Sequence, residues 1–130
     1  NATKDKISIY PPKIESLKFY SDIAIIIRVL TNMIKNALEA SPKGGKVRVY
    51  HLINDEFITF EVWNEGYIQE PIAKQIFNRN FTTKQGPGHG FGTFSMKLLG
   101  EEMLGGKVDF TTSEEGGTTF SFQIPFEKVA

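Results

Sequence analysis

One long stretch of helical period, followed at once by two stretches of alternating period, most constrains what this chain can fold into. Between residues 22 and 40, apolar side chains recur every three to four positions, and Asp22 is placed to cap a helix that runs to about Ala40. Residues 46–53 and 57–63 then alternate around Asn54-Asp55, which favours a β-hairpin. Apolar faces of a helix and a sheet are buried against each other. The pattern predicts a helix packed on an antiparallel hairpin.

The remaining segments extend this arrangement. We expect strands at 7–10, 107–112 and 118–125, the first of them at an edge of the sheet. A short helix is expected at 71–77 and a further helix at 93–104, which ends at Gly105-Gly106. The secondary structure of residues 13–20 is ambiguous. The long helix is predicted to bury Ile23, Ile26, Ile27, Leu30, Ile34, Ala37 and Leu38, and the later helix Leu98, Leu99 and Met103. We therefore predict an α/β (α+β) fold: a two-layer sandwich of one mixed β-sheet with helices on one face.

Composition limits the class of protein. The 130 residues suit a single domain, residues 1–130, and the 15 basic and 15 acidic side chains balance, so a general attraction to nucleic acid or an anionic membrane is not indicated. The absence of cysteine excludes disulfides and thiol chemistry. No apolar stretch approaches the roughly 20 residues that span a bilayer. We expect a cytoplasmic domain cut from a longer protein, because the chain begins with Asn1 and shows no signal peptide, and membrane anchoring of the full-length protein stays open.

Two asparagines stand out in the long helix. Asn32 and Asn36 lie one turn apart and share a face with Arg28 and Glu39, although asparagine is a poor residue for a helix interior. One explanation is the polar wall of a pocket, since amide oxygens suit Mg²⁺ beside a phosphate chain. The other is an ordinary solvated helix face, and the spacing leaves both open.

Residues 81–93 form a glycine-rich run with a threonine pair and Lys84 directly before the later helix. Backbone N–H groups at such glycines approach a phosphate chain closely, and the lysine ammonium is a common phosphate partner. Residues 78–92 show no periodicity, so we expect a long loop that is mobile without ligand; a merely flexible loop is the alternative. Farther upstream, Asn64 ends a predicted strand and is followed by Glu65-Gly66. Two explanations of this motif stay open: the Asn64 side chain accepts a hydrogen bond from a ligand ring, or the three residues form an ordinary turn.

In this order, these motifs resemble the ATP-binding catalytic domain of bacterial sensor histidine kinases, which shares an ATPase superfamily with gyrase and MutL. The resemblance covers about residues 7–126. Residues 32–40 match the family's N box. The other matches are Phe77 and Phe81 of the F box with the following Thr82-Thr83-Lys84, Gly88, Gly90 and Gly92 of the second glycine box, and Gly117-Thr118-Thr119-Phe120 of the closing strand.

The resemblance implies that the chain binds ATP with Mg²⁺, that Asn36 coordinates the metal, and that Asn32 lies beside the triphosphate. Asn32 and Lys84 are the candidate catalytic residues. The candidate nucleotide-binding residues are Asn32, Lys35, Asn36, Asn64, Gly66, Ile68, Phe77, Phe81, Thr83, Lys84, Gly88, His89, Gly90, Phe91, Gly92 and Thr119. For Lys35, a solvated position is the open alternative, and for His89 a contact with phosphate is left open.

One motif departs from the family pattern. The first glycine box, usually D-x-G-x-G, reads Asn64-Glu65-Gly66-Tyr67-Ile68 here. The family's Asp accepts the adenine amino hydrogen, and Asn64 offers a neutral acceptor about half as strong. Ile68 replaces the second glycine and is expected to narrow the pocket or move the backbone. The departure predicts weaker nucleotide binding and leaves adenine specificity open.

Three functions follow as hypotheses. In the first, the domain is part of a two-component sensor kinase, a transferase that donates the γ-phosphate of ATP to a histidine on a separate dimerisation domain, with a response regulator downstream. His51 and His89, the only histidines, lack the helical setting expected of the acceptor. The second is an ATPase of the gyrase or MutL type, disfavoured because Asn32 stands where those relatives have a Glu base. The third is an interaction module with impaired nucleotide binding.

Overall fold

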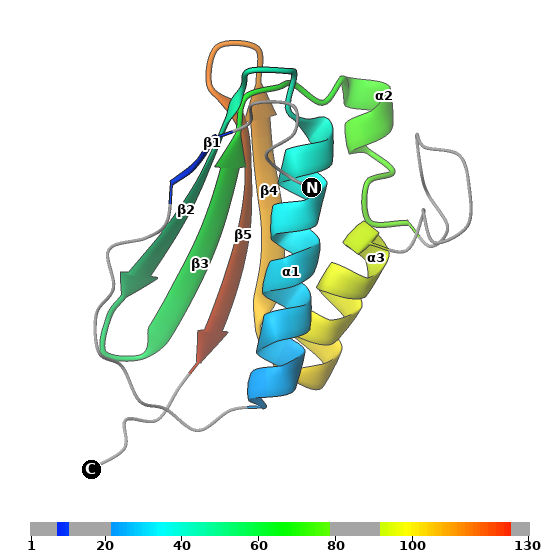
Figure 1. The fold of residues 1–130 in the computed structure, drawn as a ribbon. Helices are drawn as coiled ribbons and strands as arrows, with labels where there is room; N and C mark the ends of the chain where they lie inside the picture. Colours follow the sequence, from blue (N-terminus) through cyan, green and yellow to red (C-terminus); the bar gives the residue numbers. More distant parts are fainter. Residues whose placement is uncertain (1–7, 11–21, 79–91, 126–130) are drawn as a thin grey trace.

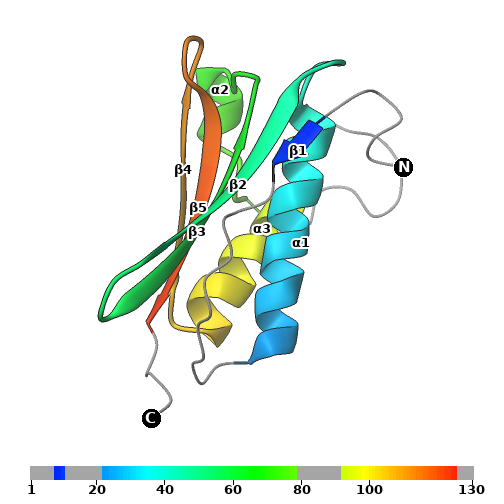
Figure 2. The ribbon, with the colours of Figure 1, turned by 60° about the vertical axis from the view of Figure 1, so that its left-hand side comes forward.

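The computed structural model describes residues 8–10, 22–78 and 92–125. A five-stranded sheet has helices packed on one of its faces (Figures 1 and 2). In chain order the elements are β1 (Ser8–Tyr10), α1 (Ile23–Ala40), β2 (Lys46–Ile53), β3 (Phe57–Asn64), α2 (Glu70–Ala73), α3 (Gly92–Lys97), η1 (Leu98–Met103), β4 (Lys107–Ser113) and β5 (Gly117–Pro125). The prediction of a two-layer α/β sandwich is confirmed.

The sheet has the strand order β1-β2-β3-β5-β4. β1 runs parallel to β2, and the other neighbours are antiparallel, so the sheet is mixed, as expected. The predicted hairpin joins β2 to β3 with Ile53 opposite Ile58. The Asn54 side chain forms its turn, because Asn54 Oδ1 accepts hydrogen bonds from the backbone N–H groups of Glu56 at 2.8 Å and Phe57 at 2.7 Å.

α1 begins where the sequence predicts. Asp22 Oδ1 accepts hydrogen bonds from the backbone N–H groups of Ala24 at 3.1 Å and Ile25 at 3.3 Å, and the helix ends at Ala40. The buried row of α1 consists of Ile26, Val29, Met33 and Ala37, which pack on the apolar residues of the sheet. These side chains make α1 the main helical cover of the sheet.

The predicted apolar face of α1 is partly wrong. Ile23 and Ile27 are 65% and 55% exposed, whereas Leu30, Ile34 and Leu38 are half-buried against the core. The apolar stripe of this helix is wider than the surface that the sheet covers. Because each residue turns the helix by about 100°, Ile27 points a quarter turn away from Ile26, and the row through Val29 and Met33 is buried instead.

Asp22→Ala is expected to lower the free energy of unfolding by about 1 kcal/mol, because two N–H groups of the first turn of α1 lose their acceptor. Urea denaturation measures this change. The matched variant Asp22→Ser keeps an acceptor oxygen and should lose less than half as much stability. Equal losses in the two variants would contradict the capping role.

The second helical segment is continuous but changes its winding, with α-helical residues in α3 followed by π-helical residues in η1. The helix and its stop at Gly105 are confirmed, but the burial expected of Leu98 and Met103 is wrong, since these side chains are 42% and 61% exposed. The buried positions are Thr93, Met96 and Gly100. A Cβ at Gly100 would lie 2.6 Å from Val108 Cγ2, so glycine lets η1 approach the sheet.

Candidate functional site

A small polar cluster interrupts the apolar, helix-facing side of the sheet at one end. It forms where β3 ends at Asn64 and β5 begins at Gly117. Asn64 lies opposite Thr118 in the register of these strands, and Thr118 lies opposite Thr112 of β4. The side chains of Asn64 and Thr118 are 1% and 2% exposed. Buried polar groups need partners, so the contacts of this cluster define what the site offers a ligand.

Asn64 presents a buried acceptor. Its Nδ2 atom donates a hydrogen bond of 2.7 Å to the backbone oxygen of Glu65, whereas its Oδ1 atom is buried and has no hydrogen-bond partner in the described structure. The opposite amide orientation would bring two acceptor oxygens together, so the Glu65 carbonyl fixes Oδ1 as the free atom. An unpaired buried acceptor costs about 1–3 kcal/mol, and a donor on a ligand would recover that free energy.

The turn after Asn64 lies against the C-terminal end of α1. Gly66 has φ +130°, and a Cβ at this position would lie 3.2 Å from both the Ala40 carbonyl oxygen and Asn64 Nδ2. Glycine is required for this conformation and for the close approach. The contact with Ala40 brings the end of β3 next to the helix turn that follows Asn36.

Two threonine hydroxyls connect the loop at residues 66–68 to the sheet. Thr118 Oγ1 donates to the Gly66 carbonyl oxygen at 3.0 Å, and the Ile68 N–H donates to Thr112 Oγ1 at 2.9 Å. The two hydroxyl oxygens lie 2.8 Å apart. Ile68 itself packs against the core. The Ile at the second glycine position of the box is therefore accommodated by packing and by a hydrogen bond to its backbone.

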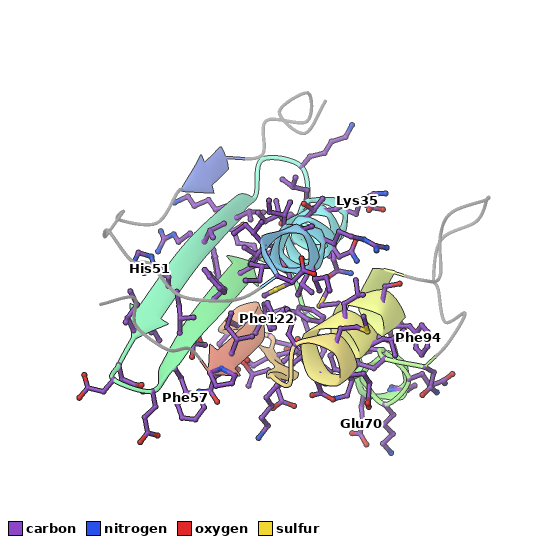
Figure 3. The ribbon with its side chains drawn as sticks, turned by 90° about the horizontal axis from the view of Figure 1, so that it is seen from below. Lys35, His51, Phe57, Glu70, Phe94 and Phe122 are labelled. Carbon is purple, nitrogen blue, oxygen red and sulfur yellow. The ribbon has the colours of Figure 1, made fainter. Side chains whose placement is uncertain are left out.

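The two asparagines of α1 are half-buried, and neither amide group has a hydrogen-bond partner among the described residues, whereas Arg28 and Glu39 are exposed. Figure 3 views α1 from its N-terminal end, and the labelled Lys35 points away from the sheet. The right-handed turn of the helix then puts Asn32 and Asn36 between the sheet-facing row and Lys35, on the side toward α3. Asn32 and Asn36 therefore do not lie on a fully solvated helix face, which was the alternative left open by their spacing.

Phe77 anchors the segment after α2. Its ring makes edge-to-face contacts with Phe110 at 5.7 Å and Phe120 at 6.0 Å between ring centroids, and Lys97 Nζ lies 4.7 Å from its centroid. The Thr93 hydroxyl donates to the Ile76 carbonyl oxygen. The start of α3, which includes Gly92, is thus joined to the residue before Phe77.

Several predicted site residues lie outside the described part of the chain: Phe81, Thr83, Lys84, Gly88, His89, Gly90 and Phe91. The same holds for the expected loop at 78–92, apart from its first and last residues. Among the described candidates, the structure brings Asn64, Gly66 and Ile68 into contact around one turn.

Thr119 lies apart from this cluster. It is opposite Trp63 in the register, on the face of β5 away from the helices, so the structure does not bring it together with Asn64. Sequence reasoning missed Thr118 and Thr112. The signal for Thr118 was available, because it shares the alternation of Phe120 and Phe122, which mark the buried face of β5. His51 is half-buried within β2, as expected.

The described residues contain no group of three or more His, Cys, Asp or Glu side chains that could hold a metal ion. Asn32 and Asn36 offer amide oxygens on the side of α1 toward α3. Mg²⁺ takes oxygen donors, keeps several waters and uses only one or two protein ligands beside a phosphate chain, so this donor set fits it.

Across the described ranges, we also find no helix whose length and hydropathy would let it span a bilayer.

Comparison with known proteins assigns the family. The sequence pattern of the family of histidine kinase-, DNA gyrase B- and HSP90-like ATPases matches residues 21–128, and the chain belongs to this family. The sensor protein KdpD of Clostridium acetobutylicum is 31% identical over 128 residues, which cover 94% of this chain and 14% of KdpD. The chain therefore spans a small part of this curated relative.

Solved structures agree with the sequence match. The nucleotide-free catalytic domain of the histidine kinase ThkA has a TM-score of 0.81 and 32% identity, with 94% of this chain and 80% of that chain covered. ThkA in complex with the response regulator protein TrrA has a TM-score of 0.77 and 29% identity, covering 95% of this chain and 35% of that chain. The resemblance to sensor histidine kinase catalytic domains is confirmed.

Proposed function

We propose that this domain binds Mg·ATP and donates the γ-phosphate to a histidine on a separate dimerisation domain of the same protein. Membership of the ATPase family and the likeness to the ThkA catalytic domain support the proposal. The observation that carries it is the meeting of two features at one end of the fold. These are the buried free acceptor of Asn64 and the half-buried amides of Asn36 and Asn32, which lie about one and two helix turns from Ala40.

Asn64 would recognise the base. Its Oδ1 atom needs a donor, and the exocyclic amino group of adenine is such a donor, while a carbonyl at the same ring position would repel it. The amide contact is weaker than the carboxylate contact of the family pattern, so the affinity is expected to depend more on the phosphate end of the nucleotide.

The phosphate end would lie along α1 toward α3. Asn36 would hold Mg²⁺ through its amide oxygen, and Asn32 would lie beside the triphosphate. When bound, the metal ion supplies charge neutralisation of the phosphate oxygens. We assign Lys84 and the glycines at 88, 90 and 92 to the phosphates, with Lys35 and His89 as further candidates, on the ground of the motif order alone.

The reaction would be an in-line transfer. A ring nitrogen of the acceptor histidine forms a bond to the γ-phosphorus, the bond from that phosphorus to the β–γ bridging oxygen breaks, ADP leaves, and the imidazole proton passes to solvent. This chain contributes positioning and charge rather than a proton acceptor. Asn32 cannot act as a general base toward water, which favours transfer to histidine over hydrolysis.

The structure of the histidine kinase ThkA in complex with the response regulator protein TrrA supports a response regulator as the indirect partner of this protein. A gyrase-type ATPase is disfavoured by the neutral side chain of Asn32. An interaction module without nucleotide is disfavoured by the fit of Ile68, whose side chain packs against the core and whose N–H bonds to Thr112 Oγ1.

The test uses the full-length protein and this domain in parallel. With γ-labelled ATP and Mg²⁺, the full-length protein is expected to acquire a label that is acid-labile and base-stable, as a phosphoramidate is. The domain alone should bind Mg·ATP in calorimetry but release phosphate very slowly. Rapid steady-state phosphate release by the domain would support the ATPase alternative, and absence of any binding would support the interaction module.

A further inference from the structure

The two threonine hydroxyls at the edge of the site form a chain of hydrogen bonds with a defined direction. A threonine hydroxyl has one proton to donate. Thr118 uses its proton on the Gly66 carbonyl oxygen at 3.0 Å. The 2.8 Å contact between the two hydroxyl oxygens is therefore donated by Thr112, which in turn accepts from the Ile68 N–H at 2.9 Å. The chain runs from Ile68 through Thr112 and Thr118 to Gly66.

This chain holds both ends of a short loop to the sheet. The carbonyl of Gly66 and the N–H of Ile68 lie on either side of Tyr67, and each is bonded to one member of a hydroxyl pair that joins β4 and β5. The peptide that precedes Gly66 carries the Glu65 carbonyl, to which Asn64 Nδ2 donates. The conformation of the loop thus sets the position of the oxygen that orients the Asn64 amide.

The chain also decides which polar groups remain for a ligand. Both hydroxyl protons are used within the protein, and so is one of the two protons of Asn64 Nδ2. The atom that has no partner at all is Asn64 Oδ1, a buried acceptor, and Thr118 Oγ1 keeps a lone pair. The second Nδ2 proton of Asn64 is the one donor left on these side chains, so the acceptors predominate. Such a set favours a ligand that presents an amino group over one that presents a carbonyl.

We propose that Thr112 is a positioning residue that sets the base selectivity of this site: its hydroxyl fixes the loop at 66–68, and the loop keeps Asn64 as an acceptor. The inference rests on the proposed nucleotide-binding function and extends it to a residue outside the motifs of the N box and glycine boxes. Thr112 contacts the loop and Thr118, and it acts on the base through Asn64.

The test compares ATP with inosine triphosphate, in which a carbonyl replaces the amino group of the purine ring. The isosteric variant Thr112→Val removes the hydroxyl, Thr112→Ser keeps it, and Thr111→Val is the matched control on the exposed face of β4. Binding of each nucleotide with Mg²⁺ is measured by calorimetry. Thermal unfolding of each variant is measured in parallel.

The unsubstituted chain is expected to prefer ATP. Thr112→Val should bind ATP about tenfold more weakly, with less than about a twofold change for inosine triphosphate, because a released loop lets the Asn64 amide turn. Thr112→Ser and Thr111→Val should keep the preference. Equal losses for both nucleotides, or an unchanged ratio in Thr112→Val, would overturn the inference. Failure of the unsubstituted chain to bind ATP would instead overturn the proposed function.

Discussion

Asn36→Ala is expected to bind Mg·ATP at least about tenfold more weakly than the unsubstituted domain, which corresponds to about 1.4 kcal/mol. Asn36 is half-buried on the side of α1 toward α3, and its amide has no partner among the described residues, so its oxygen is available to the metal. The substitution removes this oxygen and leaves the helix intact. Isothermal titration with Mg·ATP measures the change.

The stability of the variant separates binding from folding. Alanine has a higher helix propensity than asparagine, so the free energy of unfolding of Asn36→Ala should stay unchanged or rise slightly. Thr31→Ala, on an exposed position of the same helix, is the matched control and should bind Mg·ATP normally. With ATP in excess chelator, the difference between Asn36→Ala and the unsubstituted domain should shrink. An undiminished affinity of Asn36→Ala for Mg·ATP would remove Asn36 from the site.

Gly117→Ala is expected to lower the free energy of unfolding by about 3 kcal/mol or more. Gly117 has φ +77°, and an added Cβ would lie 2.5 Å from the backbone oxygen of Asn64 and 2.8 Å from Trp63 Nε1. The change therefore combines a left-handed conformation with a collision against the end of β3. Urea unfolding followed by the fluorescence of Trp63, the single tryptophan, measures it.

Gly44→Ala is the matched control for this collision. Gly44 has φ +78°, almost the same conformation as Gly117, but an added Cβ would have no atom within 4 Å. Its expected loss is the conformational part alone, about 1 kcal/mol. The difference between the two variants isolates the close approach to Asn64. Similar losses would show that the backbone at Gly117 has room to relax, and the tight packing of the site would then be refuted.

Much of the fold could be predicted because its signals are local. The cap at Asp22, the turn at Asn54 and the stop at Gly105 each depend on contacts within a few residues. The alternation of β2 and β3 is likewise local, because successive side chains of a strand point to opposite faces of the sheet. Errors appeared where a neighbour decided the outcome. Ile27 is exposed because it points about 100° away from Ile26 in the row that packs on the sheet, and Gly100 is buried because η1 needs a position without a side chain.

The candidate site likewise has features that the sequence predicts and features that depend on residues distant in the chain. The order of its motifs is a property of the sequence. Residue type and spacing singled out Asn32, Asn36 and Asn64, and the resemblance made them candidate site residues. The partners of Asn64 were not, because the hydrogen bond to Glu65 and the free Oδ1 depend on how the turn lies against α1. Thr112 was missed because β4 and β5 bring it to Ile68, which is 44 residues away in the chain.

By itself, the sequence determined the family, the element types and the residues that could meet a nucleotide, since these follow from periodicity, local turn chemistry and motif order. Only the tertiary structure decided which apolar residues of α1 and η1 are buried, that β4 and β5 bring Thr112 to Ile68, and which atom of the Asn64 amide stays free. The physical reason is that burial and hydrogen-bond pairing depend on groups distant in sequence, whose approach is set by the packing of α1 and η1 on the sheet.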